Sequence, residues 1–245
     1  MSAPVFVLPS GRLLVGTVTV DGTEGRHAAT VLRLRAGEPV ELVDGRGRRA
    51  TGSVATVVGK DVVEMDVATV VLEPPPMPRL VVVQALPKGD RGETAVETMT
   101  ELGVDEIVPW AASRCVTKWR DGRGEKALER WRTTAQAAAK QSRRARFPVV
   151  TELAGTRDVV DRLRRAAAGV VLHEEADEPL GTLEPPATGE VVVVVGPEGG
   201  LSPEELAVLV GAGATAYQLG PTVLRTSTAG TAALAAVLSR TPRWG

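Results

Sequence analysis

The residues from Val191 to Leu206, VVVVVGPEGGLSPEEL, combine an apolar strand, a glycine-rich turn and a helix start. A strand without polar alternation is typical of a parallel sheet that is buried on both faces. The glycines between Gly196 and Gly200 allow positive φ and bring backbone amides within reach of a ligand. Ser202, Pro203 and Glu205 fit a capping box with Ser202 as the N-cap. No Gly-Lys-Ser/Thr follows and the spacing is not GxGxxG, so nucleotide phosphates are not the expected ligand; a tight turn without a ligand is the alternative.

A second motif, QLGPTVLRTSTA from Gln218 to Ala229, places an arginine where the final helix is expected to begin. Thr226 is a suitable N-cap, and Arg225 before it is unusual because a cation at a helix N-terminus opposes the helix dipole. A cation placed against the local electrostatics is a candidate for function. An arginine that extends into solvent is the alternative.

The elements that must position these motifs alternate between strands and helices, which predicts a parallel sheet flanked by helices. We expect strands at 80–86, 106–110, 170–173, 191–195 and 214–219, and helices at 91–102, 125–141, 157–168, 203–210 and 226–238. In such a sheet a ligand binds at the carboxyl ends of the strands. The glycine turn is therefore expected to lie at a ligand site.

The first part of the chain is rich in Val and Thr, and it predicts short strands at 14–20, 39–43, 49–58 and 61–72 with one helix at 26–34. Short strands joined by tight turns suggest a small β-barrel. The prolines of EPPPMP, residues 73–78, cannot continue a central strand or a helix. We therefore predict two domains, a β-barrel at 1–73 and an α/β domain at 74–245.

The composition excludes several classes of protein. With 43% hydrophobic and 24% charged residues, the chain is neither disordered nor a disulfide scaffold. One cysteine, Cys115, and two histidines, His27 and His173, are too few for a structural zinc site, so no metal is expected. No apolar run approaches the ~18 residues of a membrane helix, and the N-terminus has no signal-peptide pattern. We expect a cytoplasmic protein.

The net charge of −1 conceals an uneven distribution. Residues 110–165 hold 15 Lys and Arg against 6 Asp and Glu, whereas the residues after 165 hold 3 against 9. This asymmetry suits a protein that binds phosphates on one face, although a solvated helix face explains it equally well. Since only 3% of the residues are aromatic, RNA would be bound through arginines and shape rather than through stacked bases.

Several motifs in order along the chain resemble one family. GPEGGLSPEE and LGPTVLRTSTA, together with KGDRGETAVETMTELGV (88–104), AAAKQSRR (137–144) and RHAATVLRLRAGEPVELVDGRG (26–47), are similar to the small-subunit (16S) ribosomal RNA methyltransferases that modify uracil N3 of a uridine in the decoding region. The resemblance covers essentially the whole chain. It implies a PUA-like RNA-binding β-barrel followed by a knotted SPOUT α/β domain, a homodimer, S-adenosylmethionine as the methyl donor, and the small-subunit rRNA as the substrate.

The resemblance also implies roles for individual residues. We take Arg225 as the catalytic residue, because a cation would stabilise the uracil anion formed when N3 loses its proton. The donor would contact Leu172, His173, Gly196, Glu198, Gly199, Gly200, Leu219, Gly220, Val223, Leu224, Arg225 and Thr226. The RNA would contact Arg26, Arg33, Arg35, Arg46, Lys88, Arg91, Arg114, Gln141, Arg143 and Arg144.

Two residues depart from the family pattern, and some alternatives stay open. Ser227 stands where the family usually has Glu, and Lys140 stands where Glu is common. His173 is equally well explained as a hydrogen-bonded histidine at a strand end, and Glu198 as a residue that holds its loop rather than a general base. The alternative functions are a SPOUT methyltransferase that acts on a ribose 2′-oxygen or another base nitrogen, and a non-catalytic RNA-binding factor of ribosome assembly.

Overall fold

The computed structural model describes residues 3–244, apart from the side chain of Asp121. The outer ends of the two predicted domains, Met1 with Ser2 and Gly245, lie outside the described residues. The chain divides into two compact units, Met1–Pro75 with Ala139–Phe147, and Pro76–Ala138 with Pro148–Gly245. The first unit therefore contains a second, distant segment of the chain, which the sequence did not predict.

The first unit is built on a five-stranded sheet in the order β1-β3-β4-β5-β2. Its strands are β1 (Val5–Val7), β2 (Gly16–Val20), β3 (Pro39–Val43), β4 (Arg48–Val58) and β5 (Val62–Leu72). β1 and β3 are parallel, and the other neighbours are antiparallel. The four predicted strands are confirmed to within two residues, and β1 was missed because three residues show no period.

The helix expected at 26–34 is wrong at both ends. The helical turns are α1 (Gly22–Arg26) and a π-helical turn, η2 (His27–Val31), and a short 3-10 turn, η1 (Ser10–Arg12), lies earlier in the chain. Arg33 has a φ of 55°, so helical geometry cannot continue to Leu34.

Residues 139–147 join the first unit through charged and backbone contacts. The Lys140 ammonium lies 2.7 Å from a carboxylate oxygen of Glu24. The Arg49 guanidinium donates to the carbonyl oxygen of Arg143 at 2.9 Å. Lys140, which departs from the family pattern, thus has an acidic partner within the same unit.

The second unit contains a seven-stranded sheet in the order β10-β12-β9-β11-β6-β7-β8, in which every neighbouring pair is parallel. The strands are β6 (Arg79–Ala85), β7 (Glu106–Trp110), β8 (Val149–Val150), β9 (Ala168–Leu172), β10 (Glu178–Pro179), β11 (Glu190–Val195) and β12 (Ala214–Gln218). The predicted parallel sheet is confirmed. β8 and β10, with two residues each, were not predicted.

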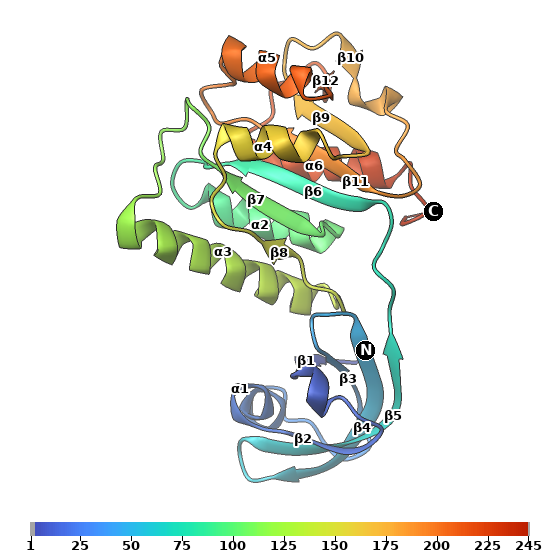
Figure 1. Ribbon diagram of the computed structural model, residues 1–245. Coiled ribbons are helices and arrows are strands. Elements are labelled where there is room, and N and C mark those ends of the chain that lie inside the picture. The colour runs from blue at the N-terminus through green and yellow to red at the C-terminus, as the bar shows by residue number, and fades with distance from the viewer. Residues whose placement is uncertain (1–2, 245) are drawn as a thin grey trace. The chain divides into compact units, whose positions relative to one another are not determined.

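Helices flank this sheet on both faces, as expected. They are α2 (Arg91–Leu102), α3 (Asp121–Gln141), α4 (Thr156–Leu163), α5 (Pro203–Gly211) and α6 (Thr226–Leu238), with a short 3-10 turn, η3 (Leu180–Thr182). Figure 1 shows α4 in front of the strands, with α2 and α6 packed together behind them. None of the helices among residues 3–244 is long and apolar enough to cross a membrane.

Two helix bounds differ from the prediction by more than one residue. α3 begins at Asp121, four residues before the expected start. α4 ends at Leu163 instead of 168, because Ala167 already donates its N–H to the carbonyl oxygen of Glu190 beside the sheet. The chain therefore leaves the helix early in order to enter β9.

β11 is the central strand, between β9 and β6, and its five valines are buried. Its position explains the apolar run, because both of its faces are covered by helices. β6, β9, β11 and β12 end at the same edge of the sheet, since all of them are parallel. The turns that follow these strands carry the motifs identified in the sequence.

Charged side chains join the amino ends of three strands. Arg79 of β6 and Arg162 of α4 each form ion pairs with two carboxylates. These carboxylates belong to Glu106 of β7 and Glu190 of β11. The Glu106 side chain is buried, so its charge is balanced by two guanidinium groups rather than by water. This network fixes the edge of the sheet opposite to the motif-bearing turns.

Candidate functional site

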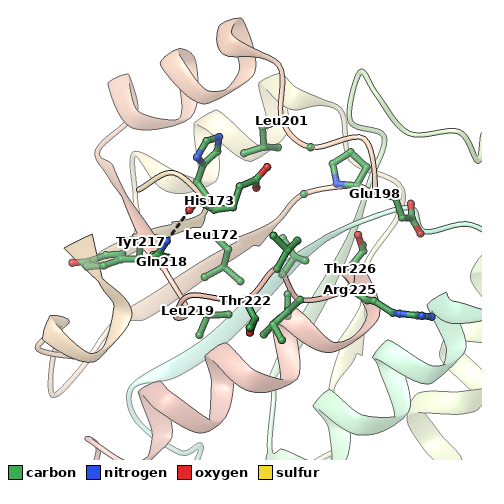
Figure 2. Close-up of a pocket in the computed structure, with 18 of the residues that line it drawn as sticks. Leu172, His173, Glu198, Leu201, Tyr217, Gln218, Leu219, Thr222, Arg225 and Thr226 are labelled. Atoms are coloured by element: carbon green, nitrogen blue, oxygen red, sulfur yellow. Dashed lines mark hydrogen bonds between the residues drawn. The ribbon is translucent and has the colours of Figure 1, made fainter. Parts of the chain in front are cut away.

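A pocket of about 310 Å³ opens at the carboxyl edge of the sheet. Segments after β9, β11 and β12 form its walls, and the first turn of α6 closes it. In the view of Figure 2, His173 and Leu201 lie above Leu172 and Leu219, and Glu198 and Arg225 lie on the right. The two sequence motifs thus line one space, although their turns lie at 196–200 and 219–225 in the chain.

The lining contains every residue predicted to contact the donor except Gly199. Gly199 lies against Arg114, whose Cβ is 3.2 Å from the place that a Cβ of Gly199 would occupy. The lining residues that were not predicted are Glu174, Val195, Pro197, Leu201, Tyr217, Gln218, Thr222 and Ala229. They are neighbours of predicted residues at the same strand ends, so extending each motif by a few positions would have found them.

The glycine turn has the local geometry that its sequence predicts. Gly200 has a φ of 70°, and its N–H donates to the carbonyl oxygen of Pro197 at 2.9 Å. The Ser202 hydroxyl accepts from the Glu205 N–H at 3.1 Å, and the Glu205 carboxylate accepts from the Ser202 N–H in return. The predicted capping box is therefore confirmed, and it sets the direction in which the turn enters α5.

Glu205 does more than cap the helix. It is 6% exposed, and its carboxylate accepts from both the N–H and the hydroxyl of Ser113, at 2.8 and 2.6 Å. It also accepts from the Thr156 hydroxyl at 3.3 Å, so it joins the starts of α4 and α5 to the loop after β7. Burial by itself would raise the pKa of Glu205, but the hydrogen bonds from Ser113 and its other partners outweigh burial, and the pKa lies below the ordinary 4.5.

Two further contacts fix the glycine turn from outside. Glu198 accepts from the Lys88 N–H at 3.0 Å, and the Arg91 guanidinium lies 4.0 Å from the same carboxylate. The Arg114 guanidinium donates to the carbonyl oxygens of Gly199 and Leu201 at 3.3 and 3.1 Å. Lys88, Arg91 and Arg114, which were all predicted to contact RNA, thus come together at this turn.

The turn after β12 requires one correction. Thr226 was expected as the N-cap of the last helix, but the N-cap is Arg225, whose extended backbone has no side-chain cap. Gly220, with a φ of 125°, allows the chain to turn sharply between β12 and α6. Thr226 is instead the first helical residue, and its carbonyl oxygen accepts from the buried Gln84 amide at 3.3 Å. Gln84 could not be predicted from the sequence, because a lone glutamine in an apolar strand has no local pattern.

Arg225 is exposed at the pocket, and no side chain described in residues 3–244 forms an ion pair or a hydrogen bond with its guanidinium. Figure 2 shows its side chain extending away from Leu219 and Thr222. An unpaired guanidinium at a helix N-terminus attracts anions, since the helix end carries a positive partial charge as well.

His173 and Gln218 brace the third wall of the pocket. The Nδ1 atom of His173 accepts from the Glu175 N–H at 3.2 Å, and the backbone N–H of His173 donates to the carbonyl oxygen of Tyr217 at 3.0 Å. Gln218 donates to the carbonyl oxygen of Glu174 at 2.8 Å, which is the dashed line in Figure 2. His173 is thus both a hydrogen-bonded residue at a strand end and a pocket residue, so the two readings from the sequence are compatible.

The remaining residues predicted to contact RNA lie in the first unit. Arg26, Arg33, Arg35, Arg46 and Gln141 are exposed, whereas Arg143 and Arg144 are half-buried. Arg143 has a φ of 60° and donates to the carbonyl oxygen of Ala3 at 2.8 Å, so it holds the segment in place. Ser227, the other departure from the family pattern, is 7% exposed in the first turn of α6 and belongs to the second unit.

Comparisons with known proteins agree with this geometry. Residues 73–238 match an RNA methyltransferase domain, and residues 20–63 match an RNA methyltransferase PUA domain. The chain is 48% identical over 229 residues to the ribosomal RNA small subunit methyltransferase E of Mycobacterium bovis, covering 92% of this chain and 87% of that protein. It is 31% identical to the enzyme of the same name from Bacillus subtilis, covering 92% and 91%.

Solved structures give the same picture. The ribosomal RNA small subunit methyltransferase E of Neisseria gonorrhoeae, bound to S-adenosylmethionine, superposes with a TM-score of 0.84 at 31% identity, covering 97% of this chain and 98% of that one. A putative methyltransferase of Legionella pneumophila in complex with the same cofactor has a TM-score of 0.81 at 28% identity, covering 98% and 99%.

We expect Glu205→Gln to lower the free energy of unfolding by about 2 kcal/mol at pH 7, because it leaves buried donors without a charged acceptor. The folded pKa lies below 4.5, so the stabilisation by ionised Glu205 is complete above that pH and is lost as the pH falls through the folded value. Urea denaturation between pH 3 and 7 measures this. The matched control is Glu204→Gln, an exposed acid in the same turn. If both changes lowered the free energy of unfolding equally, or if the difference between them did not depend on pH, the stabilising role of ionised Glu205 would be contradicted.

Proposed function

Because the chain belongs to the family of ribosomal RNA small subunit methyltransferases E, we propose that it transfers a methyl group from S-adenosylmethionine to N3 of a uridine in the decoding region of the small-subunit rRNA. The predicted family, the fold class of a PUA-like domain followed by a SPOUT α/β domain with a parallel sheet, and the methyl donor are confirmed. The target uridine and the residues of the site are our proposal.

The observation that carries the proposal is the single pocket formed by the two predicted turns. Gly200 and Gly220 have positive φ, and a Cβ at either position would meet nothing within 4 Å, so open space lies against their backbone. Such space admits a ligand close to the peptide groups. The residues present therefore fit a small molecule held largely by backbone and apolar contacts.

We assign the donor's adenosine and methionine parts to the glycine turn, the strand end at Leu172 and His173, and the loop from Leu219 to Thr226. When bound, S-adenosylmethionine supplies an activated methyl group on a sulfonium cation. The lining includes the carboxyl-bearing residues Glu174 and Glu198, and a negative charge near the pocket favours that cation. Leu172, Leu201 and Leu219 provide the apolar surface.

Arg225 is our catalytic residue. Uracil N3 becomes nucleophilic when it loses its proton, which leaves negative charge on the two flanking oxygens. The unpaired Arg225 guanidinium and the N-terminus of α6 both stabilise that charge, so the proton can leave to water. Glu198 is less suitable as a base, because it already accepts from the Lys88 N–H and lies near the Arg91 cation.

We propose that RNA is held by cations in each unit. Lys88, Arg91 and Arg114 surround the glycine turn in the α/β unit, and Arg26, Arg33, Arg35 and Arg46 are exposed on the β-barrel unit together with Gln141. A barrel domain at 1–73, a catalytic domain at 74–245, a homodimer and a cytoplasmic location complete the proposal, and sedimentation measures the oligomeric state.

The reaction is tested by incubating the protein with S-adenosylmethionine and small ribosomal subunits, followed by mass spectrometry of the nucleosides. We expect 3-methyluridine at one position. A 2′-O-methylated nucleoside, or a methyl group on another base nitrogen, would indicate the alternative SPOUT activity. A chain that binds RNA but not S-adenosylmethionine would be a non-catalytic assembly factor.

Arg225→Ala is expected to reduce the rate of methylation by roughly 10²- to 10³-fold, the usual effect of removing one group that stabilises a developing anion. Binding of S-adenosylmethionine, measured by calorimetry, should weaken far less. Arg225→Lys should recover part of the rate, because it restores the charge but not the forked guanidinium. Arg165→Ala, which removes an exposed arginine beyond the end of α4, is the control. A wild-type rate for Arg225→Ala would refute this role.

Gly220→Ala is expected to weaken S-adenosylmethionine binding at least about tenfold, because an alanine at a φ of 125° strains the backbone of the pocket. Gly213→Ala is the matched control, since Gly213 has a φ of 101°, has open space at its Cβ and lies outside the pocket lining. Both variants should lose stability, but only Gly220→Ala should lose affinity for the donor. An equal loss of affinity in both would show that the effect is general strain.

A further inference from the structure

In the segment between β7 and α3, buried and exposed side chains alternate, and the proposed function assigns no role to the exposed ones. From Cys115 to Arg120 the chain is neither helix nor strand, yet buried or half-buried residues alternate with exposed ones. Successive side chains of an extended chain point to opposite sides. Val116, Lys118 and Arg120 are the exposed members, and we call these three residues the outer row.

The inner members anchor this segment. Cys115 is 4% exposed, the Thr117 hydroxyl donates to the carbonyl oxygen of Pro87 at 2.8 Å, and the Trp119 ring packs edge-on against Trp131 at 5.1 Å. Each inner residue therefore has a fixed neighbour. The outer row is held in place by this backbone rather than by contacts of its own.

Among the described side chains, the cations of the outer row differ from other cations nearby in having no ion-pair partner. Arg130 pairs with Glu93, and Arg132 pairs with Glu152. In the part of the chain that the structure describes, the side chains of Lys118 and Arg120 form neither an ion pair nor a hydrogen bond. Neighbouring cations that no described side chain neutralises create a local positive potential, which attracts an anionic partner.

The outer row begins at the rim of the pocket. Arg114, one residue before Cys115, donates to the carbonyl oxygens of Gly199 and Leu201 in the glycine turn. Thr117 contacts Pro87, the neighbour of Lys88, which donates its N–H to Glu198. The outer row therefore follows directly on a segment that contacts the glycine turn of the pocket.

We propose that the outer row is a docking strip for the phosphate backbone of the RNA strand that flanks the methylated nucleotide. This inference rests on the proposed function. Lys118 and Arg120 each neutralise a phosphate, and Val116, which is 72% exposed, packs against a ribose. Contacts of this kind hold the strand in register and carry no base specificity.

The test uses Lys118→Ala/Arg120→Ala and small ribosomal subunits, with affinity measured over a range of salt concentrations. Each lost phosphate contact is expected to reduce the slope of log K against log salt by about 1. The control is Arg164→Ala/Arg165→Ala, which removes two exposed arginines beyond the end of α4. An unchanged slope in the Lys118/Arg120 variant, or the same change in both variants, would overturn the proposal.

Steady-state kinetics separate this proposal from the function on which it rests. The Lys118/Arg120 variant should bind S-adenosylmethionine with wild-type affinity and keep the wild-type kcat, while its KM for subunits rises. A loss of kcat with unchanged KM would contradict a docking role. A wild-type chain that methylates no rRNA would overturn the proposed function and the strip together.

Crosslinking identifies what lies on the strip. Val116→Cys, labelled with a photoreactive group, places the probe on the outer row, and the buried Cys115 in the unmodified chain serves as the labelling control. We expect crosslinks to rRNA near the modified nucleotide. Crosslinks to a ribosomal protein instead would overturn the proposal.

Discussion

The parallel pairing of β9, β11 and β12 is the constraint on which the pocket depends. Val191–Val194 pair with Ala168–Val171, and Ala214–Tyr217 pair with Gly169–Leu172, so the three strands finish at one edge. Reversing any of them would carry its turn to the opposite edge, where Arg79, Arg162 and their glutamates lie. The valines of β11 are apolar and buried, so the polar groups that can contact a ligand at this edge come from the turns after the strands.

The start of α6 is unfavourable to the isolated protein. Arg225 brings a full positive charge to a helix end that is already positive, and it offers no side-chain acceptor to the first N–H groups. Gln84 fastens this turn through the Thr226 carbonyl from the strand below. An arginine that weakens its own helix, beside a turn held by a buried amide, is expected where a bound anion balances the charge.

Local patterns predicted the parts of the fold that local forces determine. β11 was found from its valines, and the capping box was found because Ser202 and Glu205 are three residues apart. The Glu205 bonds to Ser113 join residues 92 positions apart, and no spacing rule shows them. Arg143 was expected to contact RNA because arginine binds phosphates well. Its positive φ and its hydrogen bond to the Ala3 carbonyl oxygen depend on the tertiary structure, so the sequence could not show them. The sequence motifs therefore identified the residues that line the pocket better than the long-range contacts that hold those residues in place.

The first unit is discontinuous, because Ala139–Phe147 belong to it although the rest of the unit ends at Pro75. An excised fragment that stops at Pro75 would lack Lys140, the partner of Glu24. It would also lack Arg143, whose carbonyl oxygen accepts from Arg49 and whose guanidinium donates to the carbonyl oxygen of Ala3. Exchange of one uninterrupted gene segment between relatives would therefore separate these pairs. Recombination between homologues should keep both pieces of the unit from a single parent, which ties the evolution of the barrel to the last turn of α3.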